Sequence, residues 1–175
     1  MSYRSTLPMA KNRELLKYYT EAIEHMNNYK SAIVEFIGDG QEEDVDNLTG
    51  YDKMMYFKAK LDLHELEGRI NTQEHHRQVY QDRIELMMPD FEKLSAEANV
   101  EFEAVYVEAT EVIKSNPNNR YSQTLGMILQ GWNETIKQKM DSTTMQELKN
   151  ETYKSLKTQI EAVKADGKKK MHKVR

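Results

Sequence analysis

The five histidines are the side chains whose spacing most directly tests for a metal site. Helical bundles hold di-iron centres through a glutamate three residues before a histidine on facing helices. None of the histidines in this chain has a glutamate at that position: His25, His64, His75, His76 and His172. His75 and His76 are neighbours, about 100° apart around a helix, and cannot chelate one ion together. We therefore predict no metal ligands.

A second candidate for cation binding is the acidic segment 38–50. Asp44, Asp46 and Asn47 invite comparison with the start of a calcium loop. Position six of that frame is Thr49 and position twelve is Met55, where a glycine and a bidentate glutamate are needed. We expect a solvated acidic connector here.

Catalytic motifs are missing as well. The chain has no cysteine, which excludes disulfides, thiolate metal sites and cysteine nucleophiles. No HExxH, Walker loop, GxGxxG or GxSxG occurs in it. We expect no catalytic residue and no cofactor, and an enzyme is disfavoured because function must be argued from a site.

The C-terminal tail 166–175 is a candidate for contact with phosphates or an acidic protein surface. Its basic residues are Lys168, Lys169, Lys170, Lys173 and Arg175. The alternative is a solvated end with no partner. The net charge of −4 gives no general case for nucleic acid binding, so nucleic acid is expected to reach this chain only through the tail.

Composition predicts the architecture that must position these residues. Of 175 residues, 31% are charged and 38% are apolar, and only 7 glycines and 3 prolines occur. This favours an all-α fold, an elongated antiparallel helical bundle of about five helices, two of them long, with coiled-coil-like packing. We expect an N-terminal arm over 1–7 and one helical domain over 8–165. The expected helices are 8–37, 51–88, 89–114, 117–140 and 145–164.

The stretch from Tyr51 organises this architecture. Met54, Phe57 and Leu61 recur at helical spacing and are expected to form an apolar stripe, followed by a second set that includes Leu63, Leu66 and Ile70. Pro89 either kinks one continuous helix or starts a new one. Two capping boxes are predicted at helix starts, Thr49 with Asp52 and Thr144 with Glu147.

The first helix has an unusually wide apolar face. Leu15, Ala22, Tyr29 and Phe36 widen its main stripe, which predicts two or more neighbouring helices. Helices 8–37 and 51–88 are expected to form a hairpin through the acidic loop.

Four residues are candidates for a partner interface: Gln73, His76, Arg77 and Trp132. Residues 71–78 are polar on every face, and Gln73 and Arg77 take positions where apolar residues belong. Either the bundle is thin there and the helix projects into water, or a polar layer sets register or partner choice. Trp132 either anchors an interface or packs in the core.

The function that these features favour is structural: a helical subunit or accessory component of a larger assembly, for which a virion or phage assembly protein would be suitable. Its partner would be a protein, either a second copy or another subunit. The alternatives are a nucleic-acid-associated protein that uses its basic tail and a module that captures a helix in a groove. No apolar run approaches 18 residues and no signal region opens the chain, so we expect a location in the cytoplasm or an assembly.

Overall fold

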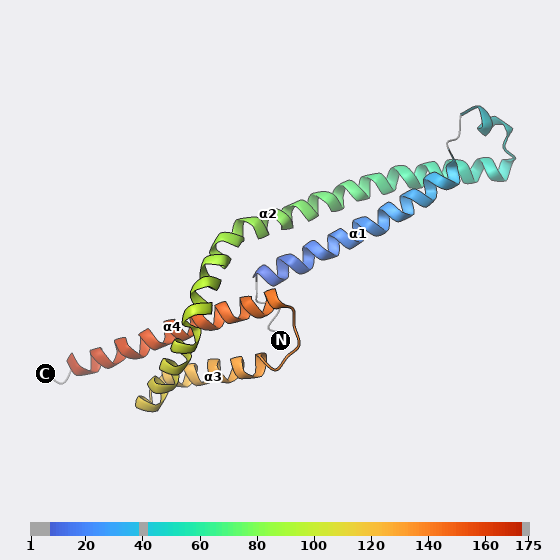
Figure 1. The fold of residues 1–175 in the computed structure, drawn as a ribbon. Coiled ribbons are helices and arrows are strands. Elements are labelled where there is room, and N and C mark those ends of the chain that lie inside the picture. Colours follow the sequence, from blue (N-terminus) through green and yellow to red (C-terminus); the bar gives the residue numbers. More distant parts are fainter. Residues whose placement is uncertain (1–7, 39–41, 173–175) are drawn as a thin grey trace. The chain divides into compact units, whose positions relative to one another are not determined.

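The computed structural model describes residues 8–38 and 42–172, and within these ranges it is helical without any strand. In chain order the elements are α1 (Pro8–Ile37), the short 3-10 helix η2 (Glu42–Asn47), α2 (Gly50–Ser115), α3 (Arg120–Thr135) and α4 (Ser142–His172) (Figure 1). The predicted all-α class is confirmed. The arm 1–7 and residues 39–41 of the acidic loop lie outside the described residues, as do Lys173 and Arg175.

One helix takes the place of the two that were expected on either side of Pro89. A proline inside a helix removes one backbone hydrogen bond and crowds the preceding turn, at a cost of roughly 3 kcal/mol. Nevertheless α2 continues through Pro89 for 66 residues. The helix has buried side chains on both sides of the proline, including Ile70 before it and Phe102 after it. The described residues therefore form four α-helices instead of about five.

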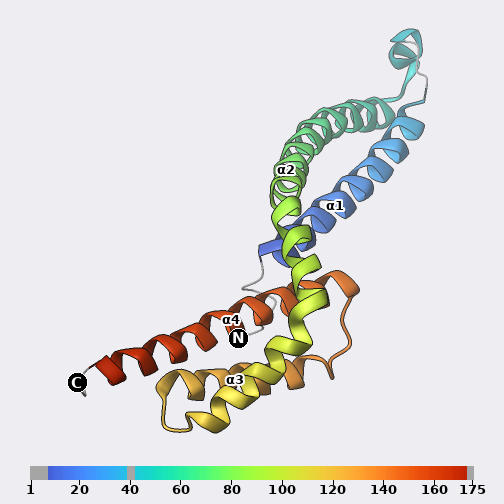
Figure 2. The same cartoon turned by 60° about the vertical axis from the view of Figure 1, so that its left-hand side comes forward.

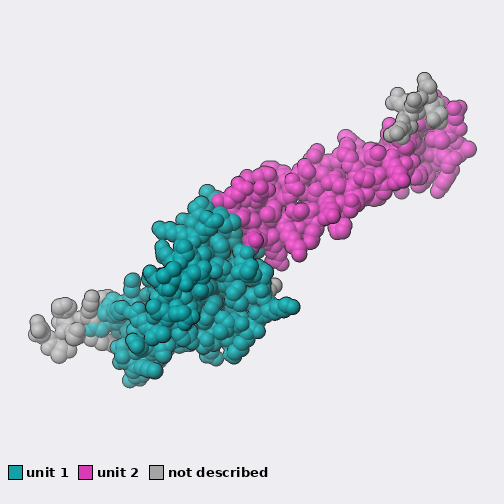
Figure 3. All heavy atoms as spheres, viewed as in Figure 1, with its two compact units in different colours: residues 1–10, 86–175 teal, residues 11–85 magenta. Residues whose placement is uncertain are grey.

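The chain divides into two compact units, shown in different colours in Figure 3. The hairpin unit comprises residues 11–85. The three-helix unit comprises residues 1–10 and 86–175. Each unit has its own core, so each is considered by itself below.

The hairpin unit consists of α1 and the N-terminal part of α2, which lie side by side in Figures 1 and 2. Lys30 bonds Glu67 at 2.9 Å, and the ring of Tyr19 stacks on that of Tyr80. Residues earlier in α1 thus contact residues later in α2, so the two helices are antiparallel. This is the hairpin that the sequence predicts. Its core is small: Ile33, Leu66 and Ile70 are buried, with Met26, Ile37, Ala59 and Leu63 packed around them.

The three-helix unit has a larger core between α3, α4 and the C-terminal part of α2. Its buried residues are Ala98, Phe102, Val105, Ala109, Leu125, Leu129, Tyr153, Leu156, Ile160 and Val163. Lys149 of α4 bonds Asn99, and Lys164 bonds Glu108 further along α2. The residue numbers of the contacting side chains rise together along the two helices, so α4 runs in the same direction as this part of α2. The expected antiparallel arrangement therefore does not extend to this pair.

Several helix ends differ from the prediction. α3 begins at Arg120, after the N-cap residue Asn119, whose side chain accepts a hydrogen bond from the Tyr121 N–H. α3 ends at Thr135, short of the predicted residue 140. In the other direction, α4 continues to His172, past Gly167, where the chain was expected to leave the helix.

The capping box predicted for Thr144 and Glu147 is wrong. α4 begins at Ser142, and Asp141 caps it by accepting hydrogen bonds from both the N–H and the hydroxyl of Thr144. Because the helix starts earlier than expected, Glu147 lies a turn beyond the cap and is available for another contact. At the start of α2, Thr49 and Asp52 do meet, but the threonine hydroxyl donates to the carboxylate itself.

Candidate functional site

The predicted polar layer lies within the helix pair of the hairpin unit. Gln73 and Arg77 are half-buried. His76 is exposed, yet its ring stacks on Tyr19 of α1 with the ring centroids 5.3 Å apart. The side-chain oxygen of Gln73 is buried and has no hydrogen-bond partner among the residues that the structure describes. The polar stretch is thus covered by α1 at this point, and its role in partner choice stays a prediction.

The other predicted site residues do not join this layer. Trp132 belongs to the three-helix unit, where its ring packs 4.9 Å from that of Phe102 at the edge of the core. Lys168, Lys169 and Lys170 lie in the last turns of α4. Contact of the basic tail with phosphates or with an acidic surface also stays a prediction.

The surface of the hairpin unit carries many large apolar side chains, which we did not predict from the sequence. The large apolar residues exposed there are Tyr18, Tyr29, Val34, Phe36, Tyr51, Met54, Phe57 and Leu61. Those buried in the same unit are Ile23, Ile33, Tyr56, Leu66 and Ile70. Among the described residues of this unit, the exposed set is the larger. Such exposure is typical of surfaces that bind another protein.

Met54, Phe57 and Leu61 form what we call the outer face of α2. They lie about 180° around the helix from the residues that contact α1, such as Leu66 and Ile70. Their side chains are 58%, 56% and 58% exposed, so the described part of the chain leaves this stripe largely uncovered. The sequence already indicates this exposure, because the stripe of Met54, Phe57 and Leu61 lies on a different side of the helix from the next apolar set, which includes Leu66 and Ile70.

The first helix shows the same pattern. Its wide apolar face predicted two or more neighbours, but α2 is the helix that packs against α1 within the described part of the unit. Tyr29 and Phe36 remain 56% and 64% exposed as a result. The hairpin unit therefore presents apolar side chains on both of its helices.

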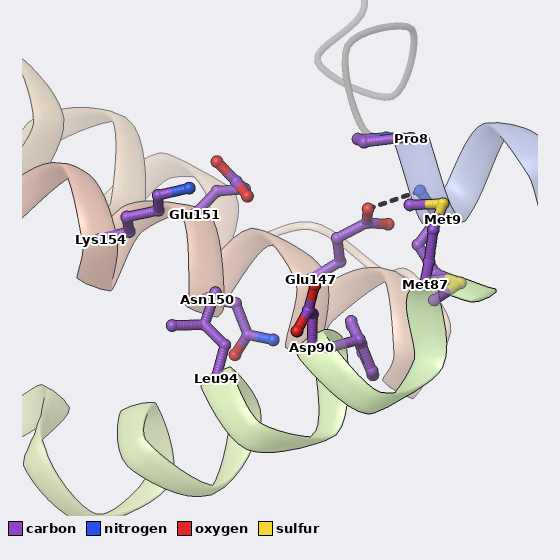
Figure 4. Close-up of a pocket in the computed structure, with 10 residues that line it drawn as sticks. Pro8, Met9, Met87, Asp90, Leu94, Glu147, Asn150, Glu151 and Lys154 are labelled. Atoms are coloured by element: carbon purple, nitrogen blue, oxygen red, sulfur yellow. Dashed lines mark hydrogen bonds between the residues drawn. The ribbon is translucent and has the colours of Figure 1, made fainter. Parts of the chain in front are cut away.

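A pocket of about 230 Å³ lies in the three-helix unit and was not predicted (Figure 4). Its apolar lining includes Met9, Phe91 and Leu94, and its polar lining includes Glu147. The Glu147 carboxylate accepts the N–H groups of Met9 at 2.8 Å and Ala10 at 2.7 Å. These belong to the first turn of α1, where backbone N–H groups have no acceptor within the helix. Glu147 thus serves as a cap for α1.

A second polar cluster links α4 to α2 in the same unit. The buried Tyr153 hydroxyl donates to the Glu101 carboxylate, and Lys157 donates to the Tyr153 oxygen at 2.9 Å. Burial, together with the hydrogen bond to Glu101, raises the pKa of Tyr153. The hydrogen bond from Tyr153, followed by Lys157, lowers the pKa of Glu101. A tyrosine that holds its proton this firmly is poorly suited to act as a general base. The cluster is best explained as an interhelical tie.

Groups of histidine and carboxylate side chains that could hold a metal ion do not occur among the described residues. In residues 8–38 and 42–172, the apolar stretches of the helices are too short to cross a membrane. Comparison of the chain with protein-family models, with curated proteins and with solved structures found no match.

Proposed function

We propose that the chain is a structural protein that self-associates through its hairpin unit and acts as a helical subunit of a larger assembly. The observation that supports this proposal is the excess of exposed over buried large apolar side chains in that unit. In the three-helix unit, the core of buried residues is larger than the exposed set of Leu86, Val100, Val107, Met127 and Ile136. The imbalance is thus a property of the hairpin.

The free energy gained by burying the exposed apolar side chains of the hairpin unit favours its association. Complete burial of a leucine, phenylalanine or methionine side chain contributes roughly 1.5–3 kcal/mol. Association costs roughly 4–15 kcal/mol in lost freedom of motion, so an interface needs several such side chains from each copy. The exposed residues of α1 and α2 meet that requirement. Two hairpins that join would also give the hairpin a further neighbouring helix.

Sedimentation equilibrium over a range of protein concentrations tests this proposal. We expect the full chain to form oligomers, and a variant with Phe57→Ser and Leu61→Ser to shift to monomer. Both side chains are mostly exposed, so the helical circular dichroism of this variant should match that of the original chain.

The matched control carries Val100→Ser and Met127→Ser. These side chains are also strongly exposed, at 84% and 74%, but they belong to the three-helix unit. We expect the control to associate as the original chain does. A chain that is monomeric up to concentrations of about 100 µM, where weak protein dimers are already populated, would overturn the proposal.

A further inference from the structure

We propose that the outer face of α2 pairs with the same face of a second copy, antiparallel and about a twofold axis near Leu61. This inference rests on the proposed self-association and specifies its geometry. Met54, Phe57 and Leu61 provide the apolar contact, since each is more than half exposed in the single chain. A twofold interface uses one surface from both copies, so that surface must be complementary to itself.

The spacing along α2 gives this complementarity. Met54 and Gly68 are each seven residues from Leu61 and lie on the same side of the helix. An antiparallel pair centred on Leu61 therefore places Met54 of one copy over Gly68 of the other. Gly68 faces open space, because a Cβ added there would meet no atom within 4 Å. A flexible methionine side chain fits such an opening.

The charges beside the outer face agree with the antiparallel direction. Lys58 and Glu65 lie on the same flank of it and are exposed. Neither has an ion-pair partner in the part of the chain that the structure describes. Antiparallel pairing brings the same flanks together, so Lys58 of each copy comes close to Glu65 of the other.

A parallel pair is less favourable because it joins opposite flanks. The other flank carries Lys53 and Lys60, and a parallel pair would bring Lys53 of one copy next to Lys58 of the other. In the antiparallel pair both of those lysines keep the partners they have within their own chain. Lys53 bonds Asp46 at 3.1 Å, and Lys60 lies over the ring of Tyr56.

Cross-linking tests the position of the axis. The chain has no cysteine, so a single Leu61→Cys substitution in the full chain supplies one thiol per copy. We expect mild oxidation to convert this variant to a covalent dimer, because residue 61 of one copy faces residue 61 of the other. Val100→Cys is the control: it is 84% exposed but lies in the three-helix unit, and it should cross-link far more slowly.

Charge reversal tests the direction of the helices. In the proposed dimer, residue 58 of each copy faces residue 65 of the other. Lys58→Glu alone, or Glu65→Lys alone, therefore places like charges at both contacts and should weaken dimerisation about tenfold at low salt. The double variant restores both pairs and should regain the original affinity. A mixture of the two single variants should form a heterodimer, since each mutated residue then faces an opposite charge.

The cross-linking and charge-reversal results test the pairing through α2, whereas the association state of the chain tests self-association itself. If the chain associates but residue 61 cross-links no faster than residue 100, or the charge variants all associate alike, the pairing through α2 is wrong and self-association stands. If the chain is monomeric at every concentration, both are wrong.

Discussion

At the scale of single residues, the contact between Tyr153 and Glu101 is the best test of the interhelical tie in the three-helix unit. Tyr153 is 2% exposed and its hydroxyl bonds both Glu101 and Lys157. In a Tyr153→Phe variant this hydroxyl is lost, and we expect the free energy of unfolding to fall by about 1–2 kcal/mol near pH 7, as measured by urea denaturation.

The same substitution should change the pH dependence of stability. The pKa of Glu101 is lower in the folded chain, so the stability that its ionised form contributes is present above the unfolded pKa and is lost as the pH falls through the folded pKa. Without the tyrosine hydroxyl the pKa of Glu101 rises toward its ordinary value. The difference in stability between the two proteins should therefore narrow in acid. An unchanged Glu101 titration by carbon NMR would contradict this account.

Residue-level prediction from the sequence succeeded where contacts are local and failed where they are distant. Thr49 and Asp52 were paired correctly because they are three residues apart on one turn. Glu147 was assigned to the start of its own helix, but it binds N–H groups that precede it by 138 and 137 residues. No spacing rule connects such positions, because the contact depends on how the helices pack.

At the scale of elements, the start of α1 depends on a side chain from α4. Replacement of Glu147, a residue that is 5% exposed, by alanine leaves the Met9 and Ala10 N–H groups without their acceptor. We expect this to destabilise the chain by about 1–3 kcal/mol and to speed hydrogen exchange at those two amides. Glu147→Gln keeps one acceptor oxygen and should cost less.

Glu151→Ala is the matched control for that prediction. It lies one turn further along α4 and lines the same pocket, but its side chain is exposed. Its effect on stability should stay within about 0.5 kcal/mol. If Glu151→Ala were as damaging as Glu147→Ala, the loss would reflect general disturbance of the pocket and the capping role of Glu147 would be wrong.

The helices themselves were largely predictable, and their ends were less so. Apolar residues at steps of three and four identify all four α-helices, because buried side chains must share one face. At Pro89 local propensity leaves open a kink or a new start, and α2 in fact continues through the proline. The outer face of α2 shows a second limit: periodicity identifies an apolar stripe without showing whether the chain itself covers it.

At the scale of the whole molecule, the two units differ in the size of their cores. The cluster in the three-helix unit contains ten buried residues, from Ala98 to Val163, whereas that of the hairpin unit contains Ile33, Leu66 and Ile70. Stability depends mainly on buried apolar surface, so the hairpin should be the weaker unit. Any process that covers its exposed side chains would then contribute a large share of its stability.

We therefore expect two unfolding transitions in a calorimetric scan of the full chain, with the hairpin unit melting first. Binding of a second copy stabilises the folded form by mass action, so the first midpoint should rise by a few degrees for each tenfold increase in protein concentration. The midpoint temperature of the second transition should not change with protein concentration, because the core of the three-helix unit lies within one chain. In the Phe57→Ser and Leu61→Ser variant the first midpoint should lose its concentration dependence while the second stays in place. A first transition that is independent of concentration in the original chain would show that the exposed face of α2 contributes nothing to stability, and self-association through the hairpin would then be wrong.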